Sequence, residues 1–233
     1  MKRSGGTEGQ KRRAGERAAD AVSDGDVVGL GTGSTAAAAI RALGRRVDAG
    51  LDVRAVPTSY GSRTLARETG IPLTTLEEAS PGIAIDGADR IAGIDGDGPP
   101  ALIKGGGAAH AREKVVDAAA DRFVVVADPT KLTDRLDGPV PVEVLPDAVP
   151  VVTEALSALG GEPTLRVAER KDGPVVTDNG NLVVDCAFGH IAAPGSLATD
   201  LAALPGVVEH GLFVGLADAV YVGTDDGVDA YRF

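Results

Sequence analysis

A chain of 233 residues with 43% hydrophobic residues is long enough for one large domain, or two modest ones, with a real core. Its formal net charge of −11 opposes binding to nucleic acid or to an anionic membrane surface. No apolar run approaches the roughly 18 residues of a transmembrane helix, and the N-terminal residues lack the apolar segment of a secretory signal, so we expect a cytoplasmic protein.

The acidic residues are mostly aspartates, whereas lysine occurs only six times. This composition suggests a highly saline cytoplasm, and an ordinary acidic soluble protein is the alternative. In either case a few local cations must bind any anionic substrate against an unfavourable overall field.

Strands alternate with helices through residues 1–136, which predicts parallel βαβ units and an α/β fold. Thr7 is the expected N-cap of a first helix over 7–23. The other expected elements are strands over 26–30, 52–56, 72–76, 82–86, 101–103 and 122–128, and helices over 34–50, 59–70 and 108–120. Residues 90–100 are expected to form a loop.

The pattern changes after residue 136. Strands over 139–145, 163–168 and 181–188, helices over 149–161 and 198–206, and a TDNGN turn at 177–181 predict a small α+β domain with an antiparallel sheet. The strand over 218–224 is apolar enough to return to the main sheet. We therefore expect a domain of residues 1–136 completed by 212–233, and a small inserted domain of residues 137–211.

A glycine-rich loop, GLGTGST at 29–35, joins the first strand to a helix. It is neither a dinucleotide fingerprint, because Ser34 replaces the last glycine, nor a P-loop, because it lacks the lysine. Its backbone N–H groups, with the hydroxyls of Ser34 and Thr35, can bind an anion such as a phosphate monoester. A plain turn with Ser34 as N-cap explains this loop alone equally well.

Two carboxylates, Asp86 and Asp89, follow the strand over 82–86. Ligands of α/β sheets bind at the carboxyl ends of parallel strands, and two neighbouring carboxylates can divide the roles of acid and base. A calcium loop is disfavoured because Ala88 and Arg90 occupy two of its ligand positions. A surface turn is the alternative.

Lys104 ends the strand over 101–103 and precedes Gly105–Gly107 and a helix. We expect its ammonium group at the same sheet edge as Asp86. Glu113 is expected about one and a half turns into the helix, leaning toward the helix N-terminus. Three successive glycines are costly in conformational entropy, so a close approach of a ligand explains them better than a plain tight turn.

Lys131 follows the strand over 122–128 and is either a ligand-binding or an ordinary solvated lysine. The three histidines, His110, His190 and His210, form no metal-ligand spacing and suggest no Ser–His–Asp arrangement. Cys186 is the only cysteine, which excludes an intrachain disulfide, and we expect it to be buried.

Together these segments resemble type A ribose-5-phosphate isomerases. The similar segments are GTGST (31–35), IDGAD (85–89), IKGGGAA…REK (103–114), VADPTK (126–131), PVEVLP (141–146), VVTDNGN (175–181), PGVVEHGLF (205–213) and GTDDGV (223–228). They span nearly the whole chain in the order of the family. Arg90, where the family usually has an acidic residue, and the long loop over 92–100 depart from the pattern and leave the details near Asp89 open.

The resemblance implies interconversion of D-ribose 5-phosphate and D-ribulose 5-phosphate through an enediolate, in the non-oxidative pentose phosphate pathway. It also implies that the enzyme needs no metal or other cofactor and assembles as a homodimer or homotetramer. The implied fold is a Rossmann-like parallel-sheet domain with an inserted small ferredoxin-like domain.

Glu113 matches the base of the family, and Lys104 with the N–H groups of Gly105, Gly106 and Gly107 would stabilise the enediolate. Asp86 and Asp89 match the residues that hold the sugar hydroxyls and assist ring opening. The remaining implied substrate-binding residues, several of them for the phosphate, are Lys11, Thr32, Gly33, Ser34, Thr35, Gly87, Ala88 and Lys131.

Two other classes of protein are weighed against this expectation. A non-catalytic sugar-phosphate sensor of the same fold generally carries a DNA-binding head, but only 25 residues precede the first expected strand. The presence of both Lys104 and Glu113 also argues for chemistry. A nicotinamide-dependent dehydrogenase is disfavoured by the incomplete dinucleotide fingerprint.

Overall fold

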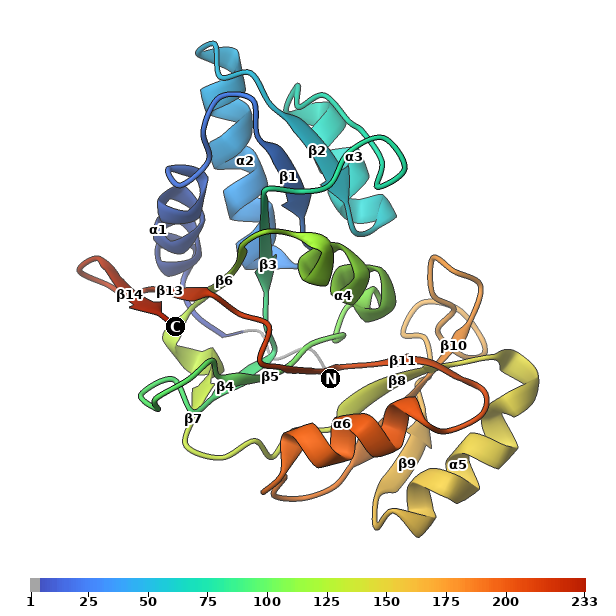
Figure 1. The fold of residues 1–233 in the computed structure, drawn as a ribbon. Coiled ribbons are helices and arrows are strands. Elements are labelled where there is room, and N and C mark those ends of the chain that lie inside the picture. The colour runs from blue at the N-terminus through green and yellow to red at the C-terminus, as the bar shows by residue number, and fades with distance from the viewer. Residues whose placement is uncertain (1–4) are drawn as a thin grey trace.

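The computed structural model describes residues 5–233, whose strands form three sheets (Figure 1). The largest sheet has six strands in the order β14-β13-β6-β3-β1-β2. These strands are β1 (Val27–Leu30), β2 (Arg54–Pro57), β3 (Ile83–Gly87), β6 (Phe123–Ala127), β13 (Ala219–Gly223) and β14 (Val228–Arg232). Every neighbouring pair is parallel except β13 and β14. The predicted return of the chain to the main sheet is confirmed.

The strand order creates a switch point between β1 and β3. From β1 the chain moves outward to β2, and it then crosses back to β3 on the other side. Open α/β sheets bind ligands at the carboxyl ends of the strands at such a point. The GTGST loop and the IDGAD segment leave β1 and β3 here, side by side, and Gly31 N donates to Ile85 O at 3.0 Å.

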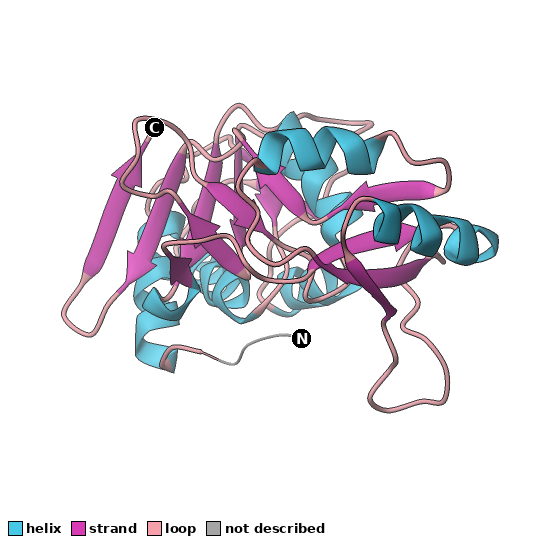
Figure 2. Ribbon diagram, turned by 90° about the horizontal axis from the view of Figure 1, so that it is seen from below, coloured by secondary structure: helices cyan, strands magenta, loops and turns pink. Residues whose placement is uncertain are grey.

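Helices cover both faces of the main sheet, as the view from below shows (Figure 2). Three helices, α1 (Glu8–Ala19), α2 (Ser34–Asp48) and α3 (Tyr60–Glu68), contribute to the core on one face. The other face is covered in part by α4 (His110–Ala119), whose Val116 packs against β1 and β2. The predicted N-cap of α1 is confirmed, because the Thr7 hydroxyl accepts from Gln10 N within a capping box.

A second sheet packs against the same face as α4. Its strands, in the order β12-β5-β4-β7, are β4 (Arg90–Ala92), β5 (Ala101–Ile103), β7 (Leu132–Thr133) and β12 (Leu212–Val214). Ile91, Leu102 and Phe213 from this sheet form one buried cluster with Val125 of the main sheet.

Three local expectations about strands were wrong. The strand over 101–103 does not join the main sheet, because its partners are β4 and β12. The segment 90–100 is not wholly a loop, because β4 pairs with β5 in a hairpin. The segment 72–76 contributes only an isolated bridge from Leu73 to Ala55. These strands are too short for their partners to be recognised from local sequence.

The third sheet has the order β11-β8-β10-β9 and is fully antiparallel. It comprises β8 (Val140–Val144), β9 (Glu162–Leu165), β10 (Leu182–Ala187) and β11 (Val207–His210), with α5 (Val149–Ala158) and α6 (Pro194–Ala202) between them in the chain. The resulting βαββαβ order is ferredoxin-like. Cys186 is buried in its core, as predicted. The expected fold class, a Rossmann-like α/β domain with a small α+β insertion, is confirmed.

Candidate active site

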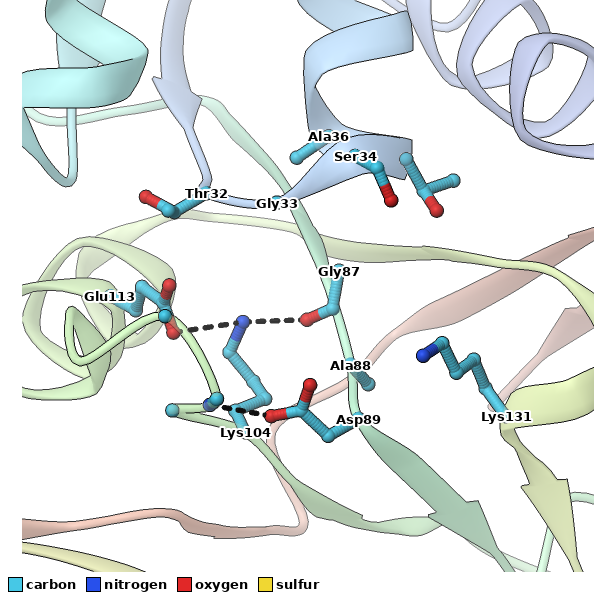
Figure 3. A pocket seen from close by; sticks show the side chains of 14 residues that line it. Thr32, Gly33, Ser34, Ala36, Gly87, Ala88, Asp89, Lys104, Glu113 and Lys131 are labelled. Atoms are coloured by element: carbon cyan, nitrogen blue, oxygen red, sulfur yellow. Dashed lines mark hydrogen bonds and ion pairs between the residues drawn. The ribbon is translucent and has the colours of Figure 1, made fainter. Parts of the chain in front are cut away.

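A pocket opens at the switch point, between the loops that leave β1, β3 and β5 and the residues beyond β6 (Figure 3). Glu113 and Lys131 lie on opposite sides of it. Its walls are formed by Thr32, Gly33, Ser34, Thr35, Ala36, Gly87, Ala88, Asp89, Lys104, Gly105, Gly106, Gly107, Glu113 and Lys131. Of the predicted site residues, only Asp86 and Lys11 do not line this pocket.

The GTGST loop ends at the N-terminus of α2. Gly33, with φ of 121°, is the N-cap, so the alternative in which Ser34 caps the helix was wrong. No side chain caps this end, which leaves the first backbone N–H groups of α2 directed toward the pocket. Together with the hydroxyls of Ser34 and Thr35, they can bind an anion.

Asp86 is fully buried beneath the pocket and organises its floor. Its Oδ1 accepts from Thr32 N at 2.9 Å and from Gly87 N at 2.6 Å, and its Oδ2 lies 2.9 Å from Lys104 Nζ. A Cβ at position 31 would lie 2.0 Å from the Asp86 carboxyl, so only glycine fits beside it. Asp86 therefore holds both the glycine loop and the lysine.

Lys104 is the centre of a buried charge cluster. Its ammonium group donates to Gly87 O at 2.6 Å and lies 3.3 Å from Glu113 Oε2 and 3.9 Å from Asp117 Oδ2. Burial by itself lowers the pKa of Lys104, but Asp86, Glu113 and Asp117 outweigh burial and raise it. The lysine is therefore cationic at neutral pH, and it reaches Asp86 from the second sheet rather than from the edge of the main sheet.

The carboxylates around Lys104 are harder to ionise than usual. Burial, reinforced by the nearby charge of Asp86, raises the pKa of Glu113 to about 8 although Lys104 opposes the shift. Burial also raises the pKa of Asp86, and it raises that of Asp117 well above the ordinary value. One ammonium group cannot fully compensate three buried negative charges, which favours the protonated form of carboxyls in this cluster.

Glu113 lies nearer the start of its helix than predicted. Because α4 begins at His110, Glu113 is in its first turn rather than one and a half turns in. The preceding glycine loop closes over the imidazole of His110, where a Cβ at position 105 would lie 2.7 Å from Nδ1. His110 is fully buried, and burial lowers its pKa to about 3, so it is neutral.

The two remaining predicted lysines differ in position. Lys131 lines the pocket from a short 3₁₀ helix (Pro129–Lys131) after β6. Asp128 caps that helix by accepting from Thr130 N at 3.0 Å. Lys11 forms an ion pair of 2.9 Å with Glu8 and does not reach the pocket wall.

Two residues of the site, Asp117 and Ala36, were not predicted from the sequence. Asp117 follows Glu113 by four residues, a spacing that places two side chains on one helix face, so a signal was available. Ala36 carries no chemical signal and lines the pocket through its position in the first turn of α2.

Within residues 5–233, no group of three or more His, Cys, Asp or Glu side chains is arranged to hold a metal ion. In the same range, no helix is both long and apolar enough to cross a membrane.

The uncapped N-terminus of α2 faces a buried carboxylate–ammonium pair across one pocket. This arrangement is suited to an α/β enzyme that moves protons within a small anionic substrate. Residues 54–227 match the family described as Ribose 5-phosphate isomerase A (phosphoriboisomerase A), and the chain belongs to this family. The resemblance found in the sequence motifs is thereby confirmed.

Relatives and solved structures agree with this assignment. The ribose-5-phosphate isomerase A of Natronomonas pharaonis is 75% identical over 98% of this chain and 99% of its own, and that of Halorubrum lacusprofundi is 66% identical over both full chains. The structure of ribose 5-phosphate isomerase A from Methanocaldococcus jannaschii is 45% identical, with a TM-score of 0.91 over 96% of this chain and 98% of that one.

A solved D-ribose-5-phosphate isomerase in complex with phospho-erythronic acid is also similar. It is 40% identical, with a TM-score of 0.93 over 98% of this chain and 100% of that one. Several of the relatives come from halophilic archaea, which agrees with the acidic composition.

Proposed function

We propose that this pocket interconverts D-ribose 5-phosphate and D-ribulose 5-phosphate, the reaction for which its family is named, with Glu113 as the proton carrier. The observation that carries the proposal is the buried Glu113 carboxyl, 3.3 Å from the Lys104 ammonium, facing an anion site across the pocket. The complex of a similar isomerase with phospho-erythronic acid supports it, because the carboxylate of that acid resembles an enediolate.

The proposed chemistry needs one carboxylate. Ionised Glu113 removes the proton from C2 of the open-chain aldose, which leaves an enediolate, and returns a proton to C1. A second proton moves from the oxygen on C2 to the oxygen on C1, so the product is the ketose. A single base on one face serves both steps.

Negative charge on the enediolate oxygens is stabilised by groups already in place. Lys104 supplies a positive charge, and the N–H groups of Gly105 and Gly107 supply hydrogen-bond donors, because that of Gly106 already donates to Asp89. Asp89, whose Oδ2 accepts from Gly106 N at 2.7 Å, is placed to bind a sugar hydroxyl and to assist ring opening. Asp86 lies behind Lys104, so we assign it to holding that lysine rather than to contact with the sugar.

The phosphate is assigned to the opposite side of the pocket. The N-terminus of α2 offers backbone N–H groups together with the hydroxyls of Ser34 and Thr35, and Lys131 adds a positive charge nearby. Thr32, Gly33, Gly87 and Ala88 complete the wall. Lys11 would bind the phosphate only after its ion pair with Glu8 is broken.

Three further expectations remain proposals. We propose a small domain over 137–211 and a catalytic domain over 1–136 and 212–233, which is supported by the separate β11-β8-β10-β9 sheet. The protein is expected to be cytoplasmic, and it is expected to assemble as a homodimer or homotetramer, which analytical ultracentrifugation would test.

The reaction can be followed by ¹H NMR with ribose 5-phosphate in D₂O and a metal chelator present. We expect conversion to ribulose 5-phosphate, with deuterium entering at the exchanging carbon and no added cofactor. An unchanged spectrum from folded protein would reject the proposal. A parallel titration with a nicotinamide dinucleotide is expected to show no binding, whereas binding would favour a dehydrogenase.

A further inference from the structure

A side chain from the small domain reaches the catalytic glycine loop. Arg166 follows β9, and its Nη1 donates to Gly105 O at 2.9 Å and to Gly106 O at 3.4 Å. Arg166 does not line the pocket. It therefore contacts the loop from behind, on the side away from the substrate.

The guanidinium group of Arg166 is held firmly. Its Nε donates to Asp185 Oδ2 at 2.8 Å and its Nη2 donates to Asp185 Oδ1, so the pair is bidentate. Both side chains are largely shielded from solvent. The backbone of Arg166 is also fixed, because its N donates to Val183 O at 2.8 Å and its O accepts from Val175 N at 2.9 Å.

The glycine loop needs such an external anchor. Gly105 has φ of 101° and Ala108 has φ of 58°, so the backbone turns sharply at both ends of the glycines. The hydrogen bond from Ala108 N to Gly105 O at 3.0 Å closes this turn. Glycines gain nothing from side-chain packing and have the greatest conformational freedom, so fixed carbonyl contacts restrict the loop effectively.

The two carbonyls that Arg166 binds are covalently linked to N–H donors of the loop. The Gly105 carbonyl shares a planar peptide unit with the N–H of Gly106, and the Gly106 carbonyl shares one with the N–H of Gly107. A cation at the oxygen of an amide polarises it and strengthens its N–H as a donor. The Gly106 N–H donates to Asp89 Oδ2 at 2.7 Å, so through this peptide unit Arg166 also supports the carboxylate proposed to bind a sugar hydroxyl.

We propose that Arg166, held by Asp185, is a positioning residue for the isomerisation. It fixes and polarises the Gly105–Gly107 loop so that the Gly106 N–H holds Asp89 and the other N–H groups of the loop stabilise the enediolate. This inference rests on the proposed function of the pocket. The N–H groups act on charge that develops only in the transition state. Loss of Arg166 therefore lowers kcat and leaves the binding of the ground-state substrate nearly intact.

Two ligands separate these effects. Phospho-erythronic acid carries a carboxylate in place of the enediolate, whereas ribitol 5-phosphate has the phosphate and hydroxyls but no such charge. For Arg166→Gln we expect kcat to fall about 10- to 100-fold, part of the effect of losing a complete oxyanion donor. Affinity for phospho-erythronic acid should fall in parallel, while KM and affinity for ribitol 5-phosphate should change less than about threefold.

Two companion variants test the role of the guanidinium group itself. Asp185→Asn keeps Arg166 but removes its bidentate anchor, and it should lower kcat in the same pattern by a smaller factor. In Arg166→Ala, added guanidinium ion should restore part of the lost kcat, whereas ammonium ion at the same concentration should not.

Val152→Ala is the matched control, because Val152, on α5, is fully buried in the core of the same domain. It should lower the melting temperature without changing kcat. The proposal is overturned if Arg166→Gln keeps kcat within about twofold, or if both ligands weaken equally. If Arg166→Gln does not fold, the same two comparisons, of kcat with the wild type and of the affinities for the two ligands, are made with Asp185→Asn. Absence of turnover in the wild type would instead refute the proposed function.

Discussion

Glu113→Gln removes the proposed proton carrier while keeping its shape. The side chain is buried in the first turn of α4, with Oε2 3.3 Å from Lys104 Nζ. An amide fills the same space and can still hydrogen-bond to the sugar, but it can neither accept the C2 proton nor return it to C1. We therefore expect substrate binding to persist and turnover to be lost.

The size of the effect follows from the role of the group. A positioned general base contributes roughly 10²- to 10⁴-fold, which corresponds to roughly 3 to 5 kcal/mol of activation free energy. The folding stability of Glu113→Gln should increase relative to the wild type, whereas its turnover falls. The folded state raises the pKa of Glu113 to about 8, so it binds this proton more tightly than the unfolded chain does.

The sign of the pH dependence follows from that shift. The contribution of Glu113 to folding stability is complete below the unfolded pKa of about 4 and is lost as the pH rises through about 8. The glutamine variant has no such loss. The difference between its melting temperature and that of the wild type should therefore increase from pH 5 to pH 9. In the wild-type enzyme, kcat/KM should rise with pH up to about 8, because only ionised Glu113 acts as a base.

The assay is deuterium exchange and ketose formation from ribose 5-phosphate, with ribitol 5-phosphate binding measured separately by calorimetry. Glu154→Gln, an exposed substitution on α5 far from the pocket, is the matched control and should keep full turnover. Turnover of Glu113→Gln within about tenfold of wild type would remove this residue from the mechanism. Loss of ribitol 5-phosphate binding would show that the variant disturbs the pocket instead.

Three other substitutions probe the same pocket. Lys131→Ala should raise KM with little change in kcat, because phosphate is bound alike in the ground and transition states; a fall in kcat alone would contradict this. Lys104→Arg keeps the charge but replaces a compact ammonium fitted against Gly87 O at 2.6 Å, so kcat should fall about 100-fold, and wild-type kcat would show that charge alone suffices. Asp117→Asn should raise the melting temperature more at pH 8 than at pH 5, because burial raises the pKa of Asp117; an equal gain at both values would refute this.

The pocket was predictable where its residues follow the buried apolar strands of the main sheet. The GTGST loop and the IDGAD segment follow apolar runs whose identity as parallel strands is a local property of the sequence. The position of Lys104 was not predictable in the same way. Its strand, β5, has three residues, and one of its partners is β12, more than 100 residues later in the chain. No local pattern encodes that pairing.

The sequence motifs beyond residue 136 resemble the family, but they did not predict what their side chains do in the structure. In the structure, the buried Glu143 Oε1 accepts from Thr177 Oγ1 at 2.9 Å, from Asn179 Nδ2 at 2.9 Å and from Asn181 Nδ2 at 2.8 Å. This network ties the TDNGN turn to β8, and Asp178 in the turn accepts from Tyr60 N at the start of α3 at 2.7 Å. Such long-range polar contacts depend on the assembled fold, so sequence spacing alone could not reveal them.

The charge balance of the cluster explains how a lysine shared by three carboxylates can still assist the reaction. In the proposed mechanism, Glu113 becomes neutral when it takes the C2 proton, and Lys104 loses one of its ionic partners at that moment. The enediolate gains the same negative charge in the same step, within reach of the same ammonium group. The net charge of the buried region does not change, so no further burial of charge opposes the step. Stabilisation comes from exchanging one partner of Lys104 for another, which requires the ammonium to be fixed beforehand by Asp86 and Gly87 O.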